Sequence, residues 1–437
     1  MRFSARSAAE ACGGRLVGED IALDGASFDS RALRPGELFV PIVAARDGHD
    51  FIAAALTAGA PAYLTAGPIV GAATAIVVSD TADALTALGG WARDGLASGV
   101  GPRAAGITGS VGKTSVKDLA AAAVAARWRV AANPRSFNNE QGLPITLLGA
   151  PDDSEALILE MGMRGPGEIQ QLCATARPSI GVVTVVAPAH TERVGGIDGV
   201  ARAKAELIEA LPADGVAILN AGDPRVLAMA ERTSARRLTF GGANSGADVE
   251  VTGLRLDSEA RPSFTARTPW GSAEVTLAVP GAHMATNAAA ALAVALVCDV
   301  PLEAAAARLG DAGLSPWRME LGRSAGGVIV LNDAYNANPT SMRAALDALA
   351  ALPTGRRVAV LGVMAELDDP EPAHRAIAHE AAAMGIEVIV VGTDLYGLAP
   401  VDDPLGVLAG LGEGDAVLVK GSRVAGLEVV AAWLLER

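Results

Sequence analysis

A glycine-rich turn in the first third of the chain carries residue types that can hold a phosphate group. It reads Gly106-Ile107-Thr108-Gly109-Ser110-Val111-Gly112-Lys113-Thr114-Ser115 and lies between an apolar run and a helical segment. Glycines let backbone N–H groups wrap closely around phosphate oxygens, and the N-terminus of the next helix favours negative charge. Lys113 can bridge the β- and γ-phosphates, and Thr114 can place its hydroxyl on magnesium. The turn predicts ATP binding by Gly109, Ser110, Val111, Gly112, Lys113, Thr114 and Ser115.

The spacing of this turn departs from the common GxxxxGK[ST] pattern, because Ile107 stands where the first glycine is expected. A glycine turn that only caps a helix is the alternative, and the strand-GKT-helix context argues against it. A phosphate loop also needs an acid at the end of a neighbouring strand to hold the metal. Glu160 closes the apolar run ALILEMG and is the candidate, although a strand-end Glu is often merely solvated.

The segments around the turn alternate between strand-like and helical patterns. ALILEMG, IGVVTVV and GVAILN alternate with helical segments such as VKDLAAAAVAA and GVARAKAELIEAL. This alternation predicts a parallel sheet with right-handed connections. Beyond residue 247, DVEVTGLRL, SFTART and AEVTLAVPG predict a β-meander, and an Ala-rich helix is expected from Thr286.

Two more α/β patterns flank this central region. Before it, ELFVPIV, AYLT and AIVV surround the helical segment DFIAAALTAGA; after it, strand-like runs such as RVAVLGVMAEL and DAVLVKGS alternate with helices. The last pattern is Rossmann-like but lacks GxGxxG, so it gives no reason to expect NAD. A length of 437 residues predicts two to four domains. We predict three α/β domains: a small one (1–85), a central P-loop domain with a parallel sheet and added β-meander (86–312), and a Rossmann-like one (313–437).

Composition excludes several classes of protein. With 35 basic and 49 acidic residues the formal charge is -14, which argues against a general nucleic-acid binder. The cysteines Cys12, Cys173 and Cys298 form no CxxC pair, and we expect reduced, buried thiols. The longest apolar run, 288–298, is about half of the roughly 20 residues that a membrane span needs, and no signal peptide is evident. We therefore expect a cytoplasmic protein without a membrane span.

Several motifs together resemble the Mur ligase family in order and spacing. They are TGSVGKTS, NPRSFNNEQGLPITLL, ALILEMGMRGPGEI, VVAPAH, ARAKAEL, WRME, LNDAYNANP and VLVKGSR. The resemblance covers nearly the whole chain and includes the family's three-domain plan and its shortened phosphate loop. Asn138-Asn139-Glu140 and the run 332–339 are similar to the members that add D-alanyl-D-alanine. The DYAHTP-like and Asp-Asn-Pro-Arg motifs of the lysine and diaminopimelate adders are absent from the sequence.

The resemblance implies an ATP-dependent amide-bond ligase of peptidoglycan precursor synthesis, which we expect to be a monomer. In such a reaction ATP phosphorylates the carboxylate of UDP-N-acetylmuramoyl-tripeptide, and the amine of D-alanyl-D-alanine attacks the acyl phosphate. Magnesium and Lys113 are expected to stabilise the transferring phosphoryl group and the oxyanion. Two alternatives remain: a Mur-type ligase for another amino acid, and a non-catalytic nucleotide-binding paralogue. The intact set Lys113, Glu160, His190 and Lys204 argues against the paralogue.

Two magnesium sites are implied by the resemblance. Thr114 and Glu160 match the first site, whereas His190 in VVAPAH and a carbamylated Lys204 in ARAKAEL match the second. A neutral amine that captures carbon dioxide becomes a carboxylate, which can ligate a hard cation. Without the match to the family motifs, Lys204 would be interpreted as a solvated helix residue and His190 as an ordinary loop residue.

The resemblance also assigns residues to the nucleotide. Asn287 matches the adenine-contacting Asn, Arg318 an Arg that reaches the phosphates, and Asp333 the ribose-binding acid. Tyr335, Asn336 and Asn338 are expected to line the same pocket. The alternative for these Asn residues is turn chemistry, because an Asn-rich segment before a proline often initiates a helix.

Substrate residues are implied in all three domains. Ser30 and Arg31 of the N-terminal domain match the uridine-side motif, and Asn139 and Glu140 lie where the sugar nucleotide or peptide is expected. The Lys420-Gly421-Ser422 motif is expected near the incoming amine, with a glycine turn after a buried strand as the alternative. The sequence also departs from the family pattern, chiefly at Met284, where Asn is usual, and at Val363, where an acid is usual.

Overall fold

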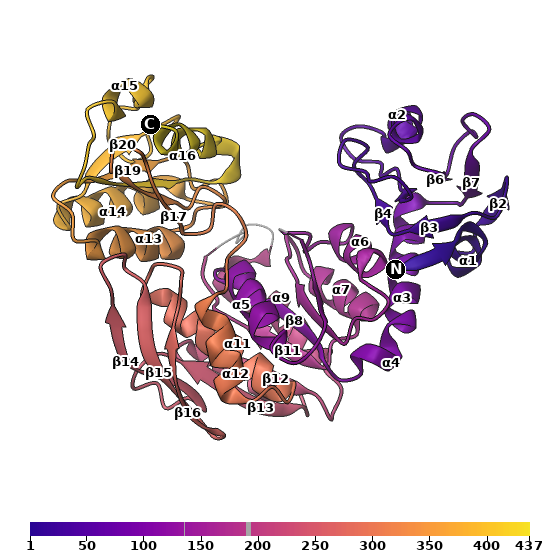
Figure 1. Cartoon of the computed structure of the whole chain (residues 1–437), viewed down its shortest axis with the longest axis horizontal. Coiled ribbons are helices and arrows are strands. Elements are labelled where there is room, and N and C mark those ends of the chain that lie inside the picture. The colour runs from indigo at the N-terminus through magenta and orange to yellow at the C-terminus, as the bar shows by residue number, and fades with distance from the viewer. Residues whose placement is uncertain (135, 189–193) are drawn as a thin grey trace.

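A computed structural model describes residues 1–134, 136–188 and 194–437 of the chain. Its elements form three α/β units that follow one another along the sequence (Figure 1). The central unit lies between the two others, with the N-terminal sheet on one side and the C-terminal sheet on the other. This arrangement confirms the predicted α/β class.

The N-terminal unit is small and mixed. Its five-stranded sheet has the order β2-β7-β6-β5-β4, and β1 and β3 form a separate antiparallel pair. The buried strand AYLT lies at its centre, as the apolar runs predict. The bounds are β1 Arg2–Ser4, α1 Ala5–Ala11, β2 Arg15–Val17, β3 Ala22–Asp24, β4 Ala26–Ser27, β5 Leu38–Phe39, η1 Gly48–Phe51, α2 Ile52–Thr57, β6 Ala62–Thr65 and β7 Thr74–Val77.

The central unit is built on a nine-stranded sheet of order β16-β15-β14-β13-β12-β11-β8-β10-β9. Strands from β9 to β14 in this order pair in parallel, and β14, β15 and β16 form the predicted antiparallel meander. The bounds of the strands are β8 Ala104–Thr108, β9 Val130–Ala132, β10 Ala156–Glu160, β11 Ile180–Val183, β12 Val216–Asn220, β13 Arg236–Gly241, β14 Val249–Leu256, β15 Pro262–Thr268 and β16 Gly271–Thr276.

Helices cover this sheet and bury its apolar strands. Helix α11 packs against α5 and against strands β13 and β14, and the Ala-rich sequence lets these elements approach closely. The bounds are α3 Thr81–Gly95, α4 Ala97–Val100, α5 Lys113–Val124, α6 Gly142–Gly149, α7 Glu168–Ala176, α9 Gly196–Glu209, α10 Pro224–Leu227, η2 Ala228–Arg232, α11 His283–Val297 and α12 Leu302–Gly310.

The C-terminal unit has a five-stranded sheet of order β17-β18-β21-β19-β20, in which only β17 is antiparallel to its neighbour. The carboxyl ends of its parallel strands carry the site residues of this unit. The bounds are β17 Glu320–Arg323, β18 Ile329–Asn332, α13 Pro339–Ala351, β19 Arg357–Leu361, α14 Pro370–Ala383, β20 Glu387–Val390, α15 Pro404–Leu408, β21 Ala416–Lys420, η3 Arg423–Ala425 and α16 Glu428–Leu435.

The start of one helix and the burial of one cysteine differ from what the sequence predicts. The helix expected from Thr286 begins at His283. Its N-cap residue is Ala282, which has no capping side chain, so the sequence does not mark where this helix begins. Cys173 and Cys298 are free and buried as expected, but the expectation of burial is wrong for Cys12, which is half-buried. Helix α3 runs through residue 85, so the division of the chain at that point remains a prediction. No helix in the described residues is long and apolar enough to cross a membrane.

Candidate active site

The glycine-rich turn has the geometry of a phosphate cradle. It joins β8 to α5, and Gly109 and Gly112 have φ angles of 150° and 86°, which favour glycine. A Cβ atom on Gly109 would overlap the Thr184 hydroxyl, which donates a 2.6 Å hydrogen bond to the Val111 carbonyl. The backbone of the turn therefore packs too closely for a side chain at Gly109, and Thr184 fixes it from strand β11's end.

Lys113 and Thr114 begin helix α5 and face the end of strand β10. The Lys113 ammonium donates to the Gly109 carbonyl at 2.8 Å, and burial lowers its pKa while the nearby Glu160 carboxylate acts in the opposite direction. The Thr114 hydroxyl donates to Glu160 Oε2 at 2.7 Å. Strand β10 pairs directly with β8, so the structure confirms the neighbouring-strand position expected for Glu160.

Glu160 is held by two Asn residues that precede α6. Asn138 donates to Glu160 Oε1 at 2.6 Å, and the Asn133 side chain bonds both the Glu160 N–H (2.6 Å) and its carbonyl (3.2 Å). The buried Lys117 ammonium donates to the Asn133 carbonyl at 2.9 Å. These contacts of Asn133 and Lys117 were not expected from the sequence, which gives no local signal for them.

Arg318 reaches the phosphate loop from the start of the C-terminal unit. Its Nη2 donates to the Thr114 hydroxyl at 3.1 Å, and its guanidinium lies 4.0 Å from the centre of the Tyr335 ring. Both of its neighbours, Trp317 and Met319, have left-handed backbones with φ of 61° and 50°. Such residues cost about 1–3 kcal/mol each and persist only where surrounding contacts hold them. Arg318 Nε is buried and has no hydrogen-bond partner within the described part of the chain.

Asp333 and Lys420 form a buried ion pair at the carboxyl ends of β18 and β21. The Lys420 ammonium bonds Asp333 Oδ2 and the Asn336 carbonyl, the latter at 2.9 Å. Asp333 Oδ1 accepts the Met319 N–H at 3.1 Å, which fixes the strained turn beside Arg318. The expectation that Lys420 lies near the amine substrate stays a prediction; in the structure its ammonium contacts Asp333 and Asn336.

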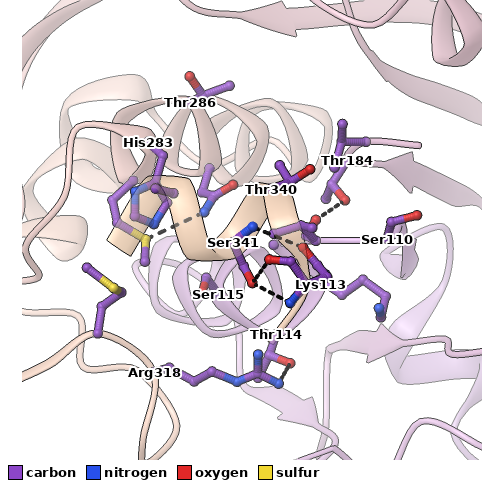
Figure 2. Close-up of a pocket in the computed structure, with 18 of the residues that line it drawn as sticks. Ser110, Lys113, Thr114, Ser115, Thr184, His283, Thr286, Arg318, Thr340 and Ser341 are labelled. Carbon is purple, nitrogen blue, oxygen red and sulfur yellow. Dashed lines mark hydrogen bonds between the residues drawn. The ribbon is translucent and has the colours of Figure 1, made fainter. Parts of the chain in front are cut away.

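A pocket of about 320 Å³ lies between the phosphate loop and the C-terminal unit. Figure 2 shows its two sides, with Ser110, Lys113 and Thr114 from the loop and Thr340 and Ser341 from α13. Asn338 lines this pocket and also caps α13, since its side chain accepts the Ser341 N–H at 2.9 Å. The lining includes expected nucleotide residues, namely Ser110, Val111, Gly112, Lys113, Thr114, Ser115, Asn287, Arg318, Asp333 and Asn336.

Helix α11 supplies the remaining wall of the same pocket. His283, Met284 and Asn287 line it, and Asn287 Nδ2 lies 3.5 Å from the Met284 sulfur. Burial lowers the pKa of His283 to about 4, with Lys420 adding to the shift and Asp333 opposing it. Its imidazole is therefore neutral at neutral pH, and this wall offers apolar and uncharged polar contacts.

A second pocket of about 340 Å³ lies on the other side of Lys113 and Arg318, which line both pockets. Lys204 of α9 is buried in its wall, and Tyr335 lines this pocket rather than the first. Asn139 also lines it, while Glu140 pairs with the lining residue Arg164 at 2.9 Å. The sequence analysis did not identify two carboxylates of this pocket: Glu168 in α7 and Glu366, which follows β19.

Three expected residues lie outside both pockets, and a fourth is not among the described residues. Ser30 and Arg31 line neither pocket; Arg31 is exposed and pairs with Asp29 at 2.8 Å. Ser422 is buried and accepts the Ala365 N–H at 2.9 Å. His190 lies outside the described residues. In the ranges 1–134, 136–188 and 194–437 no cluster of three His, Cys, Asp or Glu side chains could hold a metal alone.

Comparison with known proteins places this geometry in a family. Residues 107–295 match the Mur ligase middle domain, and residues 317–403 match the Mur ligase, glutamate ligase domain. The UDP-N-acetylmuramoyl-tripeptide–D-alanyl-D-alanine ligase of Mycobacterium tuberculosis is 41% identical, over 93% of this chain and 91% of that protein. The chain belongs to the Mur ligase family.

Other relatives of this Mur ligase carry the same name or fold. The Escherichia coli ligase of that name is 34% identical over 97% of this chain and 96% of its own. The crystal structure of MurF from Acinetobacter baumannii superposes with a TM-score of 0.88 at 27% identity, covering 100% of this chain and 99% of that one. MurF from Thermotoga maritima, solved in complex with ADP, has a TM-score of 0.80 at 26% identity and covers 94% and 97%.

The first prediction concerns the cradle of this Mur ligase. A Gly109→Ala variant must strain the backbone and displace Thr184, so we expect ATP affinity to fall at least about tenfold. Gly90→Ala is the matched control, since a Cβ there meets nothing within 4 Å. Calorimetric titration with ATP and magnesium measures both. Equal affinity in the two variants would contradict the proposed cradle.

The second prediction concerns the buried ion pair. Lys420→Met leaves the Asp333 carboxylate buried without its counterion, and we expect a loss of about 3–5 kcal/mol in unfolding free energy. Adding Asp333→Asn removes the uncompensated charge and should restore part of that loss. Urea denaturation followed by circular dichroism compares the variants. A Lys420→Met variant with the same free energy of unfolding as the parent would show that the ion pair does not stabilise this part of the fold.

Proposed function

We propose that this Mur ligase joins D-alanyl-D-alanine to UDP-N-acetylmuramoyl-tripeptide at the expense of ATP. The observation that carries the proposal is the pair of pockets that share Lys113 and Arg318. One pocket suits a nucleoside triphosphate and the other an acid and an amine, so the γ-phosphoryl group would lie at their junction. The relatives that bear this activity in their names support the choice of substrates.

The nucleotide pocket fits ATP on the residues present. The backbone of the loop leaves no room for a Cβ at Gly109, and the buried Arg318 Nε has a donor to offer to a phosphate. A carboxylate oxygen accepts more than one hydrogen bond, so Asp333 can take a ribose hydroxyl besides its two present donors. Asn287 and Met284 lie on α11 where the base would reach.

Magnesium is expected between the nucleotide and the central sheet. Thr114 and Glu160 would hold it, a hydroxyl and a carboxylate being ligands that this ion prefers. The ion supplies charge neutralisation to the phosphates. Because one to two protein ligands and several phosphate or water oxygens are usual for magnesium, a site without three clustered acids fits this use.

Lys204 is proposed to be carbamylated and to serve a second magnesium with His190. Burial, together with the Lys113 ammonium, lowers the pKa of Lys204 well below its ordinary value, and Glu366 acts against that shift. The neutral amine so favoured is the form that reacts with carbon dioxide. A buried carbamate would then carry negative charge beside Lys113, which removes the repulsion between the two ammonium groups.

Two cationic side chains of the chain are positioned to assist the transfer. Lys113 and Arg318 face the position where charge would develop on the phosphoryl group, and closure of the units around the substrates would exclude water from the acyl phosphate. We further propose the division 1–85, 86–312 and 313–437, with Ser30 and Arg31 of the first domain holding the uridine end and Asn139 and Glu140 lying beside the sugar or peptide.

The third prediction tests substrate choice. Purified protein with ATP, magnesium and UDP-N-acetylmuramoyl-tripeptide should release phosphate when D-alanyl-D-alanine is added, and not when lysine or diaminopimelate is added. A coupled phosphate assay with mass detection of the product measures this. Release with another amine alone would refute the substrate assignment, and no turnover with any amine would favour a nucleotide-binding paralogue.

The fourth prediction tests the carbamate. Lys204→Ala should reduce turnover by at least about 100-fold while ATP affinity changes little, and added short carboxylic acids should restore part of the activity. Arg202→Ala, on the same helix, is the control. Carbon-13 NMR with labelled bicarbonate should show a carbamate signal in the parent that is absent from Lys204→Ala. Identical spectra would exclude the modification.

A further inference from the structure

Glu366 lines the second pocket, here called the transfer pocket, and has no role in the proposed phosphoryl transfer. It is half-buried and lies between β19 and α14, on the C-terminal side of the pocket lined by Lys113, Glu160 and Lys204. Its Oε1 accepts a 3.2 Å hydrogen bond from Asn336 Nδ2. The Asn336 backbone is in turn fixed by the buried Lys420 ammonium. The orientation of Glu366 thus depends on the same core that fixes Asp333.

The segment that carries Glu366 is anchored at successive residues. Gly362 N–H donates to the Lys420 carbonyl at 2.9 Å, and Val363 O accepts the Ser422 N–H at 2.9 Å. Met364 N–H donates to Nε2 of His374, a fully buried side chain whose Nδ1 lies 2.5 Å from the Pro370 carbonyl and is therefore the protonated nitrogen. Ala365 N–H donates to the Ser422 hydroxyl at 2.9 Å. These contacts fix the backbone that leads to Glu366.

The other carboxylates of this pocket belong to the central unit. Glu160 accepts from Thr114 and Asn138, one on each oxygen, and is the expected metal ligand. Glu168 accepts the Arg164 N–H at 2.7 Å through Oε2. Glu366 is the lining carboxylate that belongs to the C-terminal unit among the described residues, and it faces Lys113 and Lys204 from across the pocket.

Charge decides which ligand Glu366 suits. An acyl phosphate and a nucleotide are anionic, and a carboxylate repels them. The incoming dipeptide carries an ammonium group at neutral pH, and it must approach the acyl carbon past Lys113 and Arg318, which repel it. A fixed carboxylate beside these cations offsets that repulsion and gives the ammonium a charge-assisted hydrogen bond.

We propose that Glu366 receives the ammonium end of the D-alanyl-D-alanine substrate and orients its nitrogen toward the acyl phosphate. The nitrogen loses one proton to water before it bonds to the acyl carbon and displaces phosphate. This proposal rests on the proposed function of the same site. Asn336, Ser422 and His374 are then positioning residues, which act by holding Glu366. In this proposal Ser422 positions the segment that carries Glu366, whereas the sequence analysis expected Ser422 to lie beside the substrate.

The fifth prediction uses two nucleophiles to test this role. Glu366→Gln keeps the shape and removes the charge, so kcat/KM for D-alanyl-D-alanine should fall at least about tenfold, mainly through KM. Hydroxylamine is uncharged at neutral pH and needs no ammonium anchor. Hydroxamate formation from UDP-N-acetylmuramoyl-tripeptide and ATP should therefore stay within about twofold of the parent. Glu366→Asp should recover part of the dipeptide activity.

Glu371→Gln is the matched control, because Glu371 is an exposed acid of α14 that pairs with Arg375. It should leave both reactions unchanged. Equal losses with the dipeptide and hydroxylamine in Glu366→Gln would overturn the proposal, since Glu366 would then serve the phosphoryl step or the metal. A raised KM for the UDP-linked substrate would also overturn it, by assigning Glu366 to that substrate. Absence of phosphate release from the parent protein with the dipeptide would instead refute the proposed ligase function.

Discussion

The hydroxyl of Thr114 is the point at which the two halves of the site meet. It donates to Glu160 at the end of a central strand and accepts from Arg318 at the start of the C-terminal unit. Neither partner could reach it without the parallel sheet that places β10 beside β8, or without the strained turn that projects Arg318. The rest of the site is arranged around this contact between the central and C-terminal units.

The C-terminal unit organises its contribution through one buried cation. Lys420 ends the central strand β21 and bonds Asp333 and the Asn336 carbonyl. Asp333 accepts a hydrogen bond from the N–H of Met319, the residue after Arg318 of the nucleotide pocket. Asn336 donates a hydrogen bond to Glu366 of the transfer pocket. Breaking a buried pair leaves an uncompensated charge, which makes the arrangement costly to distort. One ion pair therefore fixes groups in both pockets relative to each other.

Much of this site could be predicted from sequence because its chemistry is local. A phosphate loop consists of consecutive residues, so the sequence alone shows it. The position of Glu160 beside the loop follows from the rule that parallel strands end at one edge of a sheet. Arg318 and Asp333 were found only through family resemblance, since no local pattern marks them. Neither local patterns nor the family resemblance identified Glu366 and Asn133, because their partners lie in other segments that only folding brings close. The start of α11 was misplaced for a different reason, namely an apolar N-cap.

The two pockets differ in the number of carboxylates that line them, so they suit ligands of different charge. The nucleotide pocket combines Lys113 and Arg318 with backbone N–H groups, helix α13's N-terminus and a neutral His283, which together favour an anion. The transfer pocket shares Lys113 and Arg318, and its carboxylates are Glu160, Glu168 and Glu366. A phosphoryl group that moves from the first pocket to the second would thus leave a lining with one carboxylate, Asp333, for a lining with three, which can also accommodate an ammonium. Placing Lys113 and Arg318 on the shared wall lets the same charges serve the nucleotide and the acyl phosphate formed from it.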